Sequence, residues 1–160
     1  MSENYVWYFA YGINMNSLVL KQRGIKPIKS IVAKVPQMRI AFEMISIYRP
    51  GTGDATIRSM TKHESVPEIW GVLHWLPISA LDNYLDRWEA VDLGHYRRKK
   101  IKAITTNQTI VDAITYEALA LDLRLLPSKQ YLTGIIAGAK QFDLPMDYQS
   151  FLKRHPTFHK

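Results

Sequence analysis

Hydrophobic and polar residues alternate over several short runs of the chain, and this period of two is typical of strands with one buried face. Within IWGVLHWL at 69–76, for example, Val72, His74 and Leu76 fall on one face. Pro36 separates two runs because proline cannot donate to a strand ladder, and the polar turn TTNQ at 105–108 joins two others as a hairpin. The predicted strands cover residues 6–11, 29–35, 37–45, 55–60, 69–76, 96–104 and 109–116.

Other segments carry the capping and breaking residues that mark helix ends. The predicted helices cover residues 16–23, with Asn14 or Asn16 as N-cap and Gly24 closing it; 80–89, with Ser79 as N-cap; about 128–141, opened by Pro127 and Ser128; and a last segment after Pro145. About six strands in mostly antiparallel order, with helices at intervals, favour an α+β fold around one strongly curved or barrel-like sheet.

Length and composition set further limits. The 160 residues are 47% hydrophobic and 22% charged, which fits a single domain over residues 1–160. No apolar run approaches the ~18 residues of a membrane span, and the N-terminus does not resemble a signal peptide, so we expect a cytoplasmic protein. The chain contains no cysteine, which excludes disulfides and thiolate nucleophiles.

The formal net charge is +7, and basic residues gather at Arg97–Lys100 and Lys102. Nucleic acid, an anionic small substrate or a merely solvated strand face would each explain this cluster. A single cluster on an alternating strand is weak support for a nucleic-acid footprint. We therefore expect a solvated face, with neither nucleic acid nor membrane as a partner.

Several site classes find no support in the sequence. Among the five histidines only His155 and His159 could meet across a helical turn, and no carboxylate or thiolate partner is placed near them, so no metal is expected. The chain has no Gly-x-Ser-x-Gly elbow and no P-loop, and GTGD at 51–54 lacks the lysine of a phosphate cradle.

The stretch YFAYGINMNS at 8–17 ends a strand abruptly at Gly12 and turns into a helix. The first N–H groups of a helix have no intrahelical acceptor, and together with the helix dipole they suit a carboxylate or a developing oxyanion. Glycine also leaves room for a ligand close to the backbone. The alternative is an ordinary strand-to-helix turn that binds only water.

Glu89 is the second candidate, because it lies among apolar residues at the predicted end of a helix, where the helix dipole disfavours negative charge. Desolvation there would raise the pKa of the carboxyl group toward that of a useful base. A salt bridge to Arg97 or Arg98 is an equally economical explanation.

Together these segments resemble the γ-glutamylcyclotransferase family. YFAYGINM at 8–15 resembles its Tyr-Gly-Ser-Asn signature, and LDRWEAVDLGHY at 85–96 resembles the segment with its catalytic glutamate. ATIRSM at 55–60, IWGVLHWL at 69–76 and PSKQYLTGIIAGAKQFDLPMDYQSFL at 127–152 follow in family order. The resemblance covers nearly the whole chain and implies a small mixed β-barrel flanked by helices.

The resemblance also implies an activity: the α-amine of a γ-glutamyl compound attacks its own γ-carbonyl, releasing 5-oxoproline and a free amine without a cofactor. Nucleophile and electrophile are already in one molecule, which suits a chain without cysteine. Glu89 would be the general acid and base. The residues implied to bind substrate are Tyr8, Phe9, Ala10, Tyr11, Gly12, Ile13 and Asn14 in the loop, with Tyr131, Tyr96 and Tyr116 further along the chain. The protein would be a monomer or homodimer with a small γ-glutamyl substrate, whose other end meets loops such as 49–54.

Two residues depart from the family pattern: Ile13 stands in place of serine, and Ala90 in place of the glycine after the glutamate. Ile13 is compatible with a loop that works through backbone N–H groups, provided that its φ is negative. Ala90 costs little unless its position needs a left-handed backbone. Both changes leave open a catalytically altered member that binds a γ-glutamyl or other anionic ligand.

Overall fold

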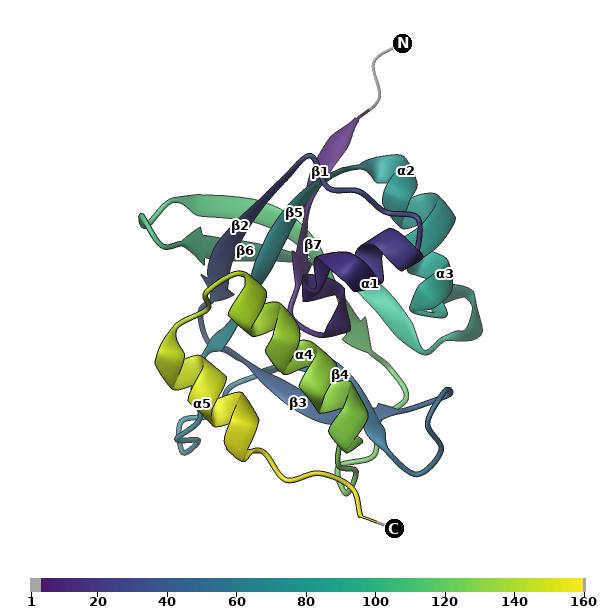
Figure 1. Ribbon diagram of the computed structural model, residues 1–160, viewed down its shortest axis with the longest axis vertical. Coiled ribbons are helices and arrows are strands. Elements are labelled where there is room, and N and C mark those ends of the chain that lie inside the picture. Colours follow the sequence, from purple (N-terminus) through teal and green to yellow (C-terminus); the bar gives the residue numbers. More distant parts are fainter. Residues whose placement is uncertain (1–3, 160) are drawn as a thin grey trace.

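The structure is a computed structural model and describes residues 4–159. Five strands close into a barrel in the order β1 (Tyr5–Ala10), β5 (Ile69–Pro77), β2 (Lys29–Val35), β6 (Tyr96–Thr105) and β7 (Ile110–Ala118). Neighbours are antiparallel except β1 and β7, whose parallel pairing closes the barrel (Figure 1). The α+β barrel is confirmed, and the described residues contain seven strands rather than about six.

The remaining two strands, β3 (Met38–Ile45) and β4 (Gly53–Ser59), form a separate antiparallel sheet with a bulge between Ala41 and Met44. This sheet is tied to the barrel by Thr56, whose hydroxyl accepts a hydrogen bond from the Ala118 N–H at 2.9 Å. A bridge between Met44 and Leu121 adds a second connection.

Alternation along the strands separates the barrel interior from its outer face. Phe9 pairs with Leu73 and its ring lies over Gly71, where an added Cβ would stand 2.8 Å from the ring. Phe9, Leu73, Ala33 and Ala103 share this fully buried inner face. Tyr8 and His74 point the other way, toward the helices, so the barrel wall supplies side chains to the space outside it.

The helices cover that outer face (Figure 1). A 3-10 turn, η1 (Ile13–Met15), leads into α1 (Ser17–Gln22), and the Asn16 side chain accepts from the Leu18 N–H, which settles the N-cap in favour of Asn16. Helix α4 (Lys129–Gln141), capped by Ser128, packs against η1 and α5 (Met146–Arg154).

A longer helical segment runs through α2 (Ile78–Ala80), a π-helical turn (Leu81–Leu85) and α3 (Asp86–Trp88). The prediction of Ser79 as its N-cap is wrong: Pro77 holds that position with an extended backbone, because proline fixes φ near the value that a helix start accepts. The 3-10 turn η3 (Val91–Leu93) follows the segment.

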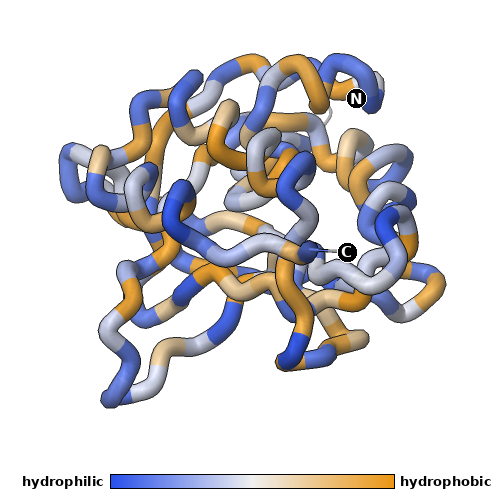
Figure 2. The backbone as a smooth tube through the Cα atoms, turned by 60° about the horizontal axis from the view of Figure 1, so that its bottom comes forward, coloured by the Kyte–Doolittle hydropathy of each residue, from blue (hydrophilic) through white to orange (hydrophobic). Residues whose placement is uncertain are grey.

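Hydropathy follows this arrangement, with hydrophobic stretches concentrated in the packed elements and hydrophilic ones at many outer turns (Figure 2). Among the described residues, none of the helices combines the length and apolar character needed to span a bilayer.

Candidate active site

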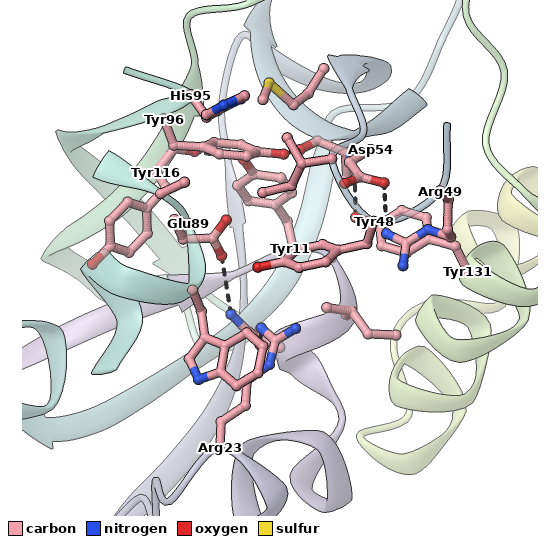
Figure 3. Close-up of a pocket in the computed structure, with 18 of the residues that line it drawn as sticks. Tyr11, Arg23, Tyr48, Arg49, Asp54, Glu89, His95, Tyr96, Tyr116 and Tyr131 are labelled. Atoms are coloured by element: carbon pink, nitrogen blue, oxygen red, sulfur yellow. Dashed lines mark hydrogen bonds and ion pairs between the residues drawn. The ribbon is translucent and has the colours of Figure 1, made fainter. Parts of the chain in front are cut away.

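A cavity of about 400 Å³ lies between the outer wall of the barrel, the β3–β4 sheet and the helix ends (Figure 3). Residues from distant parts of the sequence line it. They include Tyr8, Tyr11, Gly12, Ile13, Asn14, Arg23, Tyr48, Arg49, Asp54, Ala55, Trp88, Glu89, Ala90, His95, Tyr96, Tyr116 and Tyr131.

Glu89 is the residue that directly follows α3, and its half-buried carboxyl group faces the cavity. Burial raises its pKa from 4.5 to about 7, although the cation of Arg23 acts in the opposite direction. Its Oε1 accepts a hydrogen bond from Nδ2 of Asn14 at 3.3 Å. The carboxyl group is therefore held in place while both its protonation states are populated near neutral pH.

The alternative of a salt bridge from Glu89 to Arg97 or Arg98 is wrong. Arg97 pairs with Glu117 at 2.6 Å, and Arg98 pairs with Asp82 and Asp86 at 2.7 Å. Successive side chains of β6 point to opposite faces, so Arg97 reaches Glu117 on β7, whereas Arg98 reaches α3 but binds Asp86 there.

Asn14 is buried and bonded on several sides. Its Nδ2 also donates to the Tyr8 hydroxyl at 3.1 Å, and its Oδ1 accepts from Nη1 of Arg23 at 2.6 Å. The guanidinium group of Arg23 lies 4.5 Å from the centre of the Trp88 ring. The loop thus carries one polar side chain that connects a cation to Glu89.

His74 holds the backbone of Asn14 in place. Its Nε2 lies 3.1 Å from the Asn14 carbonyl oxygen and its Nδ1 lies 2.8 Å from the Ser30 hydroxyl. Burial lowers the pKa of His74 to about 4, so the ring is neutral. Because a carbonyl only accepts, Nε2 carries the proton and Nδ1 accepts from Ser30.

The loop after β1 reaches the cavity as predicted. In η1 the Met15 N–H donates to the Gly12 carbonyl, so the N–H groups of Gly12, Ile13 and Asn14 are the first ones of the turn and have no acceptor within it. At Gly12 a Cβ would stand 3.5 Å from the Tyr131 hydroxyl oxygen, so glycine leaves the space beside that hydroxyl open.

The structure shows how the loop accommodates Ile13 in place of the family serine. Its φ is not positive, as a β-branched residue requires. Its Cδ1 lies 2.4 Å from the position that a Cβ of Gly134 would occupy, so the end of the side chain fits against the bare backbone of α4. Glycine at 134 makes room for isoleucine at 13.

Ala90 sits in the conformation that the family glycine would suit. Its φ of 51° and ψ of 48° are left-handed, and it ends the helix that carries Glu89. Position 90 therefore does need a left-handed backbone, and alanine there strains the backbone beside Glu89.

Besides Tyr8, four other tyrosines that line the cavity have hydrogen-bonded hydroxyl groups. Tyr131 accepts from the Ala55 N–H at 3.0 Å, and Tyr96 donates to the Ala55 carbonyl at 2.7 Å. Tyr116 donates to Asp86, and Tyr11 donates to the Tyr116 carbonyl. Burial raises the pKa of each phenol, so all four remain neutral.

Two expected loop residues do not line the cavity. Phe9 points into the barrel interior, because β1 is still a regular strand and alternates its side chains, while Ala10 is buried in the sheet opposite Val72. The remaining residues implied by the resemblance lie around the cavity.

Other charged groups also line the cavity, and of these only the loop 49–54 is expected from the sequence. Arg49 binds Asp54 at 2.7 Å and lies 4.4 Å from the Tyr131 ring centre, while Arg23 follows a short helix with no motif. His95 also lines the cavity, and within residues 4–159 its buried Nδ1 has no hydrogen-bond partner. The described residues contain no group of three metal-binding side chains.

The sequence of this chain matches the model of a known protein family. The model of the AIG2-like family matches residues 68–152, more than half of the chain, and this range includes Glu89 and Tyr131. This chain belongs to the AIG2-like family. The matched range also includes β5, β6, β7 and α4.

The chain is also similar to proteins named γ-glutamylcyclotransferase. A human protein of that name is 29% identical over 146 residues, 91% of this chain and 76% of the relative. A solved γ-glutamyl cyclotransferase structure superposes with a TM-score of 0.83 at 25% identity, covering 98% of this chain and 91% of the other. The crystal structure of human loc79017 gives 0.85 at 28%, covering 99% and 92%. The resemblance to the γ-glutamylcyclotransferase family is thus confirmed.

Proposed function

We propose that this protein is a γ-glutamylcyclotransferase, which cyclises the γ-glutamyl group of a small γ-glutamyl compound to 5-oxoproline and releases the attached amine. One observation carries the proposal: the carboxyl group of Glu89, with a pKa of about 7, faces a cavity across from the first N–H groups of η1. A base with this pKa can both take and return a proton near neutral pH.

In the proposed reaction Glu89 accepts a proton from the α-ammonium group of the substrate. The freed nitrogen forms a bond to the γ-carbon, whose carbonyl electrons move onto oxygen. Glu89 passes the proton it accepted to the leaving nitrogen and takes a second proton from the attacking nitrogen. It passes the second proton to the leaving nitrogen as well, as the bond from the γ-carbon to that nitrogen breaks. Both protons lost by the ammonium group leave on the released amine, so Glu89 returns to its starting state.

The residues around Glu89 fit the other needs of this reaction. The N–H groups of Gly12, Ile13 and Asn14 would bind the glutamyl carboxylate or the developing oxyanion, because they lack acceptors within the turn. Tyr131 would hydrogen-bond the substrate with the proton that its bond to Ala55 does not use. Tyr8, Tyr11, Tyr96 and Tyr116 would shape the cavity as neutral walls.

The remaining expectations stay part of the proposal: a single domain over residues 1–160 in the cytoplasm, no cofactor in the reaction, and a monomer or homodimer. The packing of Ile13 against Gly134 supports catalysis without the family serine, because it turns the end of the side chain toward α4.

A panel of γ-glutamyl amino acids, amines and metabolites tests the proposal. Each compound is incubated with the protein and 5-oxoproline is measured by mass spectrometry. We expect product from at least one compound and none without protein. Binding of a γ-glutamyl compound by calorimetry with no product from any would favour the catalytically altered binding protein instead.

A further inference from the structure

Asn14 has to present its amide nitrogen, and not its oxygen, to Glu89 if it is to stabilise the carboxylate. An asparagine side chain is nearly symmetric in shape, so the orientation of the amide depends on its hydrogen-bond partners. The Tyr8 hydroxyl can donate or accept, and a glutamic acid that gains a proton can do both as well. Neither of these partners fixes the amide.

Arg23 does fix it. A guanidinium group has only donors, so the atom of Asn14 that lies 2.6 Å from Nη1 has to be Oδ1. Nδ2 then points to Tyr8 and Glu89, which are its partners at 3.1 and 3.3 Å. If the amide were reversed, Oδ1 would face the carboxylate and repel it.

The position of Arg23 is itself restrained. Its guanidinium group stacks on Trp88, the residue directly before Glu89, at 4.5 Å from the ring centre. One arginine therefore contacts both the loop that carries Asn14 and the helix end that carries Glu89 (Figure 3). This contact could not be predicted from the sequence, because only tertiary packing brings Arg23 and Trp88 together.

We infer that Arg23 is a positioning residue for the reaction: stacked on Trp88, it orients the Asn14 amide so that Asn14 donates to the carboxylate of Glu89. This inference rests on the proposed function only for the role of Glu89 as the base. Arg23 also adds a positive charge beside Glu89, an effect that the choice of variants separates from orientation.

Other groups also face Glu89, and they stay unchanged in the single variants of Arg23 and Lys21. They are Asn14 in η1, Tyr8 on β1, Asp54 on β4, Tyr11 in the loop, Tyr96 on β6 and Tyr131 on α4. Asp54 raises the pKa of Glu89, opposite to Arg23.

Three variants test the inference: Arg23→Lys, Arg23→Met and, as a matched control, Lys21→Met on the exposed side of α1. Lysine keeps the charge but loses the planar stacked fork. We expect Arg23→Lys to lower kcat about tenfold with little change in KM, because the carboxyl group is misplaced rather than the binding surface lost. Arg23→Met should also move the acidic limb of kcat/KM up by about one pH unit, because Glu89 loses a nearby cation. Lys21→Met should do neither.

A double variant separates orientation from a purely structural role. In an Asn14→Leu background the amide is absent, so Arg23→Lys should add almost no further loss of kcat. Equal and additive losses, or wild-type kcat in both arginine variants, would overturn the inference. Circular dichroism checks the fold, and Arg23→Lys carries the test if Arg23→Met does not fold.

A readout without turnover distinguishes failure of the inference from failure of the proposed function. The carboxyl carbon of Glu89 is titrated by NMR in the wild type and in Arg23→Met. A higher midpoint in the variant supports contact of Arg23 with this site even if the wild type forms no 5-oxoproline, in which case only the proposed function fails. An unchanged midpoint overturns the inference whatever the activity.

Discussion

Glu89 and His74 affect folding stability in opposite directions over the same pH range. Burial raises the pKa of Glu89 from 4.5 to about 7, so the native state binds the proton more tightly and loses stability as pH rises through this window. Burial lowers the pKa of His74 from 6.5 to about 4, so the unfolded state binds more protons there and stability falls as pH drops. The two effects largely cancel between pH 4.5 and 6.5.

Replacing either residue should expose the effect of the other. We expect Glu89→Gln to raise the free energy of unfolding at pH 8 by roughly 1–3 kcal/mol, with little gain at pH 4.5. Its stability should then fall more steeply on acidification than that of the wild type. His74→Gln should show the reverse slope. Urea unfolding at several pH values measures this, and identical slopes in all three proteins would contradict the assigned burial.

Ala90 gives a prediction about backbone strain. A left-handed alanine costs roughly 1–2 kcal/mol, and glycine removes most of that cost. We therefore expect Ala90→Gly to raise the free energy of unfolding by about 1 kcal/mol in urea titration. Ala137→Gly, at an exposed position within α4, should lower it by a similar amount. A loss of stability in Ala90→Gly would show that its methyl group contributes more than the strain costs.

At the scale of elements, the contact between η1 and α4 depends on the fit of Ile13 against Gly134. A Cβ at 134 would stand 2.4 Å from Cδ1 of Ile13, and this flexible end can move only by turning elsewhere. We expect Gly134→Ala to lower kcat/KM severalfold, because the Ile13 side chain is pushed away from α4 and disturbs the substrate loop.

The double variant Ile13→Ser with Gly134→Ala should recover most of that loss, since serine no longer reaches the added methyl group. Thr133→Ala, one residue away on the exposed side of α4, serves as the control and should retain activity. The packing explanation fails if the double variant is no better than Gly134→Ala alone.

Most elements could be predicted from local pattern because alternation and capping are local. The strand at 29–35 and the start of α4 after Ser128 match the prediction. The closing pair of β1 and β7 could not be read in this way, since it joins residues about a hundred positions apart. The π-helical turn at Leu81–Leu85 also has no sequence signal.

Some residues of the candidate site could be predicted from the sequence and others could not. Glu89 and Asn14 could be found because the resemblance places them in recognisable segments. Arg23 could not, because it acts through a neighbour that only tertiary packing supplies. The loop 49–54 could be expected near the substrate, but the ion pair between Arg49 and Asp54 could not. The motif alone does not show where β1 stops alternating, so it could not indicate that Phe9 lies outside the cavity lining.

At the scale of the whole molecule, the net charge of +7 does not concentrate into a free basic surface on β6. Arg97 and Lys99 both lie within 4 Å of Glu117, Arg98 contacts two aspartates, and Lys102 lies 2.7 Å from Asp112. Carboxylates on β7 and on the helical segment before β6 thus neutralise most of the basic cluster.

We therefore expect no appreciable binding of duplex or single-stranded nucleic acid. An electrophoretic shift assay at low salt measures this, with a basic DNA-binding protein as positive control. A retained complex whose affinity falls steeply with salt would contradict the expectation.

The central claim is that Glu89 moves the proton in an intramolecular cyclisation. Its most direct test is the rate of 5-oxoproline formation by the wild type and by Glu89→Gln, on the best compound of the panel and as a function of pH. Glutamine keeps the size of the side chain and removes the base, so we predict a loss of at least about a hundredfold with the fold intact. In the wild type, kcat/KM should fall as pH drops below about 7. Wild-type turnover by Glu89→Gln would contradict the claim.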